Sequence, residues 1–100
     1  MKLGIFVNTD RHPDELAGIA RAARAKGHEV SIFFMDSGTR LLGEPGIRSL
    51  CSEGCVSLSF CDFDAKRFQV SVEGISGEIV CGSQYDNAVM VNKADRVIVL

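Results

Sequence analysis

The sequence predicts an α/β protein of three layers, an open, mainly parallel five-stranded sheet with helices on both faces. Two observations lead to this prediction. Short, continuously apolar runs recur along the chain, and such runs are typical of strands that are buried on both faces. Segments with apolar residues at helical spacing lie between these runs. The length of 100 residues corresponds to one domain, residues 1–100.

The amino-terminal third contains the clearest unit. The apolar run 3–7 predicts a strand. Pro13 suits the first turn of a helix, where its missing N–H group would have no partner, and Gly27 suits the residue after the last turn. A helix over 13–26 and a second strand over 30–35 complete a βαβ unit, which is expected to be right-handed.

The rest of the chain alternates in the same way. Ser83, with Asp86 three residues later, is typical of a capping box at a helix start. We expect this helix to turn Tyr85, Ala88 and Val89 towards the core. In chain order we predict a helical turn over 39–42, a short helix over 47–53, a strand over 55–60, a short helix over 62–68, an irregular piece over 70–75, a turn at 76–77, a short strand or loop over 78–81, a helix over 83–92 and a strand over 95–100. The strand order around residues 70–81 stays open.

Composition and charge exclude several classes of function. Eleven Lys and Arg residues against thirteen Asp and Glu residues give a net charge of −2, so no basic excess is available for nucleic acid. The apolar runs are far shorter than a membrane span. The run at the amino terminus is also too short for a signal peptide. We therefore expect a cytoplasmic protein with reduced thiols and no membrane partner.

The four cysteines, Cys51, Cys55, Cys61 and Cys81, are the residues with the widest chemical range. Structural zinc sites usually combine two closely spaced pairs of ligands, whereas only Cys51 and Cys55 form such a pair here. This spacing argues against a zinc site. A packed, inert thiol is the ordinary interpretation of any one of them, because free cysteine behaves as a small apolar side chain.

Sheets of this class hold their sites at the carboxyl ends of the strands, which gives three candidate loops: residues 8–12, 36–40 and 61–64. A dinucleotide-binding domain needs a glycine-rich turn after the first strand, and loop 8–12 contains no glycine. A receiver domain needs a lysine after its last strand, and none follows the run ending at Leu100. Neither class fits.

Cys61 stands at the end of the third predicted strand, directly before a predicted helix. A helix N-terminus favours the nucleophilic thiolate. Asp62 and Asp64 oppose it through like-charge repulsion, and Lys66 and Arg67 lie close enough along the helix to offset them. The sequence leaves the balance of these effects open.

Three segments resemble the DsrE/DsrF-like family, which includes the TusD-type subunits of sulfur relays. They are residues 33–42, the strand 56–61 that ends in Cys61, and the tail 82–100 with its Ala-Asp-Arg-Val strand. The resemblance implies a DsrE-like domain with flavodoxin-like topology. It also implies that Cys61 takes up a sulfane sulfur as a persulfide and passes it to a partner thiol, as in a sulfurtransferase, with no metal or organic cofactor. Sulfur donor and acceptor proteins would be the partners, in a homo- or hetero-oligomer.

Other residues are assigned weaker roles. Ser37, Gly38, His12 and Arg67 are possible supporting residues of a Cys61 site. Cys55 would lie about 20 Å from Cys61 along a regular strand, so it is not a local resolving thiol. Two alternatives remain: a non-catalytic oligomeric binding or scaffold subunit, and a thiol redox sensor in which Cys61 pairs with Cys81.

Overall fold

The amino-terminal βαβ unit forms as the sequence predicts. In the computed structural model, which describes residues 1–75 and 77–100, strand β1 (Lys2–Val7) leads into helix α1 (Pro13–Ala25) and then into strand β2 (Glu29–Phe34). Pro13 occupies the first turn of α1. Gly27 follows the helix with φ of 82°, a backbone conformation that glycine adopts without the steric cost of a Cβ atom.

The remaining elements also follow the predicted sequence of helices and strands. The predicted short helix over 47–53 is divided into α2 and a 3-10 turn. Residues 78–81, predicted to be either a short strand or a loop, contribute to the strand β4. The predicted turn at 76–77 lies partly outside the described residues. In chain order the structure has a 3-10 segment Asp36–Gly43, α2 (Pro45–Arg48), a 3-10 turn Ser49–Ser52, β3 (Val56–Cys61), α3 (Asp62–Arg67), β4 (Val80–Gly82), α4 (Gln84–Lys93) and β5 (Arg96–Val99).

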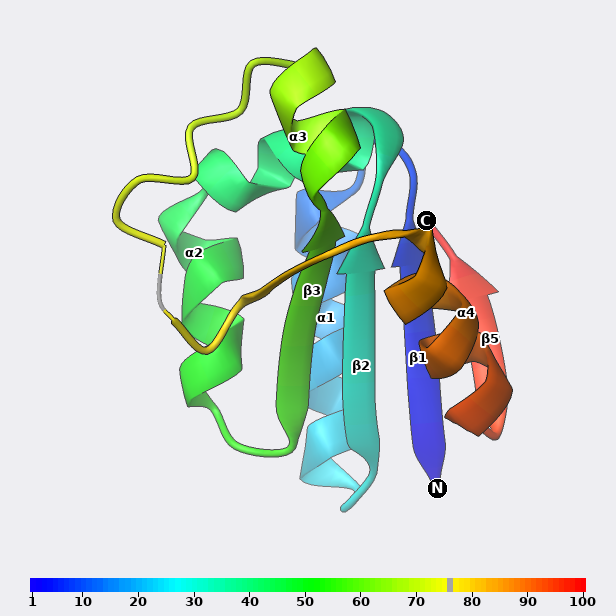
Figure 1. Ribbon diagram of the computed structural model, residues 1–100. Helices are drawn as coiled ribbons and strands as arrows, with labels where there is room; N and C mark the ends of the chain where they lie inside the picture. Colours follow the sequence, from blue (N-terminus) through cyan, green and yellow to red (C-terminus); the bar gives the residue numbers. More distant parts are fainter. Residues whose placement is uncertain (76) are drawn as a thin grey trace.

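All five strands are parallel, and their order across the sheet is β4-β3-β2-β1-β5. This architecture confirms the predicted fold class. The strand order differs from the 2-1-3-4-5 order of flavodoxin, so the expected flavodoxin-like topology holds for the layers and not for the order. The reason is that β2, β3 and β4 follow one another outward from the same edge of β1. The connection from β4 through α4 carries the chain back across the sheet, where β5 joins the free edge of β1 (Figure 1).

The hydrophobic core lies between the sheet and the layer that contains α1, α2 and the 3-10 segments. Alternate residues of the three central strands point into this layer, and each of them is a large apolar side chain. They are Leu3, Ile5 and Val7 from β1, Val30, Ile32 and Phe34 from β2, and Val56, Leu58 and Phe60 from β3. Leu16 and Ala20 of α1 complete the contact from the helix side.

The opposite face of the sheet carries α4 and is built differently. Its floor includes Ser31, Ser57 and Ser59, and the hydroxyl oxygens of Ser31 and Ser57 lie 3.2 Å apart. At Gly4 an added Cβ atom would lie 3.2 Å from the Cβ of Ala94, so glycine permits the close approach of the end of α4. Figure 1 shows α4 on the β1 and β5 side of this face, with much of β2 and β3 left uncovered.

Helix α4 begins with the predicted capping box, but it is rotated relative to our expectation. The Ser83 side chain accepts a hydrogen bond from the Tyr85 backbone N–H, and Asp86 accepts one from the Ser83 N–H. Tyr85 and Ala88 are exposed, so the prediction that they face the core was wrong, whereas Val89 is partly buried as expected. Val89 faces the sheet together with Met90, because the close approach at Gly4 fixes which side of the helix meets β1.

Candidate functional site

The carboxyl ends of β3 and β4 form a crevice at which the chain leaves in opposite directions. After β3, the segment through Val70, Ile75 and Ile79 packs against the core on the α1 face. After β4, the chain enters α4 on the other face. In open α/β sheets, ligands bind where neighbouring strands make this change of direction. Cys61 and its register partner Gly82 lie at this point.

Cys61 lies at the wall of a hollow of about 410 Å³. The residues that line it come from the end of β3, the first turn of α3, the end of β4 and the start of α4: Cys61, Asp62, Phe63, Asp64, Gly82, Ser83 and Gln84. Cys61 is 4% exposed, and the hollow is where the residue borders open space. At Gly82 a Cβ atom would lie 2.5 Å from Oδ2 of Asp86, so glycine is required for the capping carboxylate to pack here.

The charged side chains next to Cys61 are held in ion pairs. Lys66 Nζ lies 2.9 Å from Asp62 Oδ2, and this hydrogen bond holds the pKa of the Asp62 carboxyl below its usual value. Arg67 Nη2 lies 3.5 Å from Asp64 Oδ1 and 3.0 Å from Asp36 Oδ1. The two cations of α3 therefore face the carboxylates that flank the thiol, as the helical spacing suggested.

The structure brings some of the predicted supporting residues towards this site and leaves one apart. Arg67 joins α3 to Asp36, and the Asp36 backbone N–H donates to Asp64 Oδ2 at 2.7 Å, so the 36–40 loop is fixed against α3. Ser37 follows in that loop. Gly38 is buried where a Cβ would overlap the Val7 carbonyl, which gives it a packing role. His12 is exposed, faces Glu15 at 3.9 Å, and does not line the hollow.

Cys81 is the cysteine nearest to Cys61 in the sheet, but its side chain points the other way. Its register partner is Phe60, and successive side chains of a strand point to opposite faces, so Cys61 and Cys81 face away from each other. Partial burial of its sulfur raises the pKa of the Cys81 thiol, and the hydrogen bond to Asp62 and the charge of Asp62 raise it further. Lys66 opposes this effect. The sequence did not reveal the contact with Asp62, because β4 was not placed beside β3.

The other two cysteines lie away from the hollow. Cys55 is exposed at the amino-terminal edge of β3, at the opposite end of the strand from Cys61, with φ of 59°. Cys51 is partly buried, and its thiol donates to the Arg48 carbonyl oxygen at 3.0 Å. Within residues 1–75 and 77–100, no group of three or more His, Cys, Asp or Glu residues is arranged to hold a metal ion.

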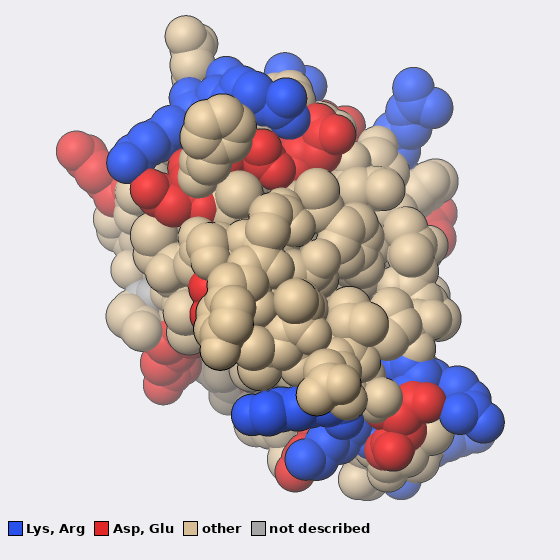
Figure 2. All heavy atoms as spheres, turned by 45° about the vertical axis from the view of Figure 1, so that its right-hand side comes forward, with Lys and Arg blue, Asp and Glu red and all other residues tan. Residues whose placement is uncertain are grey.

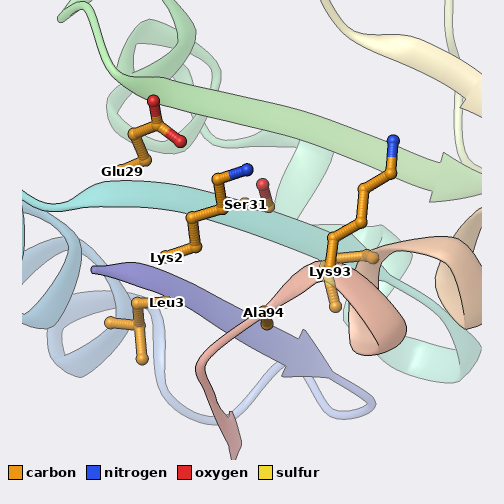
Figure 3. A pocket seen from close by; sticks show the side chains of 7 residues that line it. Lys2, Leu3, Glu29, Ser31, Lys93 and Ala94 are labelled. Atoms are coloured by element: carbon orange, nitrogen blue, oxygen red, sulfur yellow. The ribbon is translucent and has the colours of Figure 1, made fainter.

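A second hollow lies at the amino-terminal edge of the sheet, close to the end of α4 (Figure 3). Lys2 from β1, Ser31 from β2 and Lys93 from α4 surround it, with Glu29 nearby. Its volume is about 140 Å³, smaller than that of the Cys61 hollow, and no cysteine lines it. It also lies at the strand ends where sheets of this class rarely hold a site. Cys61 therefore marks the better candidate.

Comparison with known proteins places the chain in a family. The YchN protein of E. coli is 15% identical over 99% of this chain and 97% of that chain, with a TM-score of 0.68. MTH1491, a protein of unknown function from Methanobacterium thermoautotrophicum, is 12% identical over 99% of this chain and 98% of that chain, also with a TM-score of 0.68. No curated protein matches the sequence. The DsrE/DsrF-like family profile matches residues 1–100, and the chain therefore belongs to the DsrE/DsrF-like family.

Proposed function

We propose that this chain is a persulfide carrier, a sulfurtransferase-type subunit that holds sulfane sulfur on Cys61. The family is generally linked to sulfur relay. The observation that carries the proposal is the position of Cys61, which lines a hollow at the crevice between β3 and β4 where ligands of such sheets bind. The ion pairs of Asp62 and Asp64 support it, because they reduce the like-charge repulsion that a thiolate would meet.

The reaction consists of two exchanges between thiolates. The Cys61 thiolate attacks the outer sulfur of a donor persulfide R–S–SH, which gives Cys61–S–SH and the donor thiolate R–S⁻. An acceptor thiolate then attacks the outer sulfur of Cys61–S–SH. The acceptor leaves as a persulfide and Cys61 returns as the thiolate. Each step breaks one S–S bond and forms another, so there is no net oxidation and neither a metal nor an organic cofactor is needed.

We also propose that the protein works in the cytoplasm, where thiols stay reduced.

We further propose that the chain self-associates through the surface formed by α4 and β5. Val91, Val97 and Val99 are 44%, 39% and 61% exposed, and β5 is an edge strand. Figure 2 shows an uncharged area over α4 and β5 between two charged belts, the arrangement of an apolar interface with a polar rim. Self-association through this face would bury the edge of β5. Among the described residues, no helix has the length and apolar character of a membrane span.

A non-catalytic scaffold subunit is the second candidate, because Cys61 is 4% exposed, as a packed cysteine would be. The thiol redox sensor is disfavoured in its Cys61–Cys81 form, because a disulfide needs Cβ atoms that point towards each other.

Intact-protein mass after incubation with a persulfide donor separates these functions. We expect the wild type to gain one sulfur atom, Cys61→Ser to gain none, and Cys55→Ser, which removes an exposed thiol at the far end of β3, to behave as the wild type. A chain that gains no sulfur, and whose Cys61 resists alkylation while folded, is a scaffold subunit and not a carrier. A loss of two hydrogen atoms instead of a gain of sulfur would indicate a disulfide and favour the sensor.

A further inference from the structure

Two exposed aromatic residues, Phe63 and Tyr85, stand at the starts of the two helices that border the Cys61 hollow. Phe63 is 72% exposed and Tyr85 is 75% exposed, and they are the two most exposed large apolar side chains of the described residues. Phe63 lines the hollow itself, and Tyr85 follows Gln84, which lines its other side. Each aromatic is the second residue of its helix, and both helices begin at the hollow. The two aromatics therefore come from the two helices whose first residues line the hollow.

The position of Tyr85 on α4 separates it from the apolar face proposed for self-association. Val91 lies six positions after Tyr85, and at 100° per residue their side chains point about 120° apart around the helix. Tyr85 therefore points away from the side of α4 that carries Val91, and it directly follows Gln84, which lines the Cys61 hollow.

The charge around the hollow is negative. The carboxylates of Asp36, Asp62 and Asp64 share the two cations Lys66 and Arg67, and a fourth carboxylate, Asp86, packs on Gly82 at the rim. Figure 2 shows acidic groups between the uncharged area and the outer basic groups. A positively charged partner is attracted to this mouth and an acidic one is repelled.

We infer that Phe63 and Tyr85 form the docking surface for the protein that exchanges sulfur with Cys61, and that this partner presents a projecting segment in which a cysteine is flanked by apolar and basic residues. The inference rests on the proposed function. The depth of Cys61 requires a segment that enters the hollow. Phenylalanine and tyrosine are enriched at protein interfaces, and tyrosine is among the residues that most often dominate the binding energy. A second copy of the chain fits less well, because its net charge is −2.

The test measures binding without sulfur transfer. The ¹⁵N-labelled protein is titrated with a synthetic peptide in which serine replaces the reactive cysteine between leucine and lysine residues, and with a control peptide in which glutamate replaces each lysine. We expect the lysine peptide to shift the backbone signals of Phe63, Gly82 and Tyr85, and the glutamate peptide to bind at least about tenfold more weakly.

Two variants locate the contact. The double variant Phe63→Ala/Tyr85→Ala should weaken binding of the lysine peptide by about tenfold or more, whereas Val97→Ala, which also truncates an exposed apolar side chain, should leave it unchanged. Equal binding of both peptides, shifts elsewhere on the protein, or no effect of the double variant would overturn the inference. So would shifts of Phe63 and Tyr85 on dilution of the protein alone, which would assign this surface to a second copy.

The two proposals fail in different ways. A Cys61 that gains sulfur in a protein that does not bind the lysine peptide contradicts the docking surface and keeps the carrier. A protein that binds this peptide at Phe63 and Tyr85 without gaining sulfur contradicts the carrier, and with it the assignment of the partner as a sulfur-exchange protein.

Discussion

The two faces of the sheet use the same strands for different purposes. In β3 the residues that face α1 are Val56, Leu58 and Phe60, all of them buried, while those that face α4 are Ser57, Ser59 and Cys61. The first set forms the core. The second set is small or reactive, and α4 covers it only in part. We therefore expect the α1 face to supply more of the stability, which would leave the α4 face free to hold a thiol and open surfaces.

The largest expected effect comes from comparing the stability lost on truncating two neighbouring residues of β3 that face opposite sides of the sheet. Leu58→Ala should lower the free energy of unfolding by about 2–5 kcal/mol, because the side chain is 1% exposed and the core cannot fill the space. Ser57→Ala, one residue earlier and on the α4 face, should change it by less than about 0.5 kcal/mol. Urea unfolding measures both. Similar losses for the two variants would show that the faces contribute alike.

A second test examines how closely α4 is held. Gly4→Ala places a Cβ atom 3.2 Å from the Cβ of Ala94, so the end of α4 has to move, and we expect a loss of about 1–3 kcal/mol. Gly18→Ala in α1 meets no atom within 4 Å and should instead stabilise the protein by about 0.5–1 kcal/mol. Thermal unfolding of the pair gives the sign of each change. An unchanged stability of the Gly4 variant would mean that α4 is loosely attached.

A third, smaller effect concerns the start of α4. Ser83→Ala removes the hydroxyl that accepts the Tyr85 N–H, and it should cost about 1 kcal/mol. Because α4 covers only part of its face, we expect the α4 amides to exchange hydrogen faster while the β2 and β3 amides stay protected. Hydrogen exchange followed residue by residue provides the measurement. Uniform acceleration throughout the chain would show instead that α4 unfolds together with the core.

The smallest expected effect concerns the pKa of the Cys81 thiol at the carboxyl edge of the sheet. Asp62→Asn removes the charge that, after partial burial, raises the pKa of Cys81. The Cys81 thiolate should therefore form at lower pH, and alkylation of Cys81 should reach half of its maximum rate at a lower pH than in the wild type. Cys55, exposed at the opposite edge, is the internal control and should alkylate as before. An unchanged pH profile for Cys81 would mean that Asp62 does not control this thiol.

Several parts of the site were accessible from the sequence. The position of Cys61 after an apolar strand and before a helix was sufficient to place it at the carboxyl edge of the sheet, because strands and helices of this kind alternate in parallel sheets. The pairing of Lys66 with Asp62 followed from helical spacing. The contacts of Gly82 and Cys81 with the end of β3 did not follow, because they depend on β4, a strand of three residues with no alternating pattern.

The orientation of α4 shows the same limit. Its beginning was predicted correctly from Ser83 and Asp86, since a capping box is a local arrangement of four residues. Tyr85 was predicted to face the core because it shares one side of the helix with Ala88 and Val89, yet it is 75% exposed. The side of a helix that faces a sheet depends on the sheet residues against which the helix packs. For α4 these include Gly4 and the serines of β2 and β3.

By itself, the sequence determined the elements, the parallel sheet and the strand end at which Cys61 stands, because apolar spacing, capping residues and glycine positions act over a few neighbouring residues. The tertiary structure alone decided the strand order, the crevice between β3 and β4, the opposite orientations of Cys61 and Cys81, and the exposure of Phe63 and Tyr85. Those features depend on contacts between residues far apart in the chain, for which local patterns carry no signal.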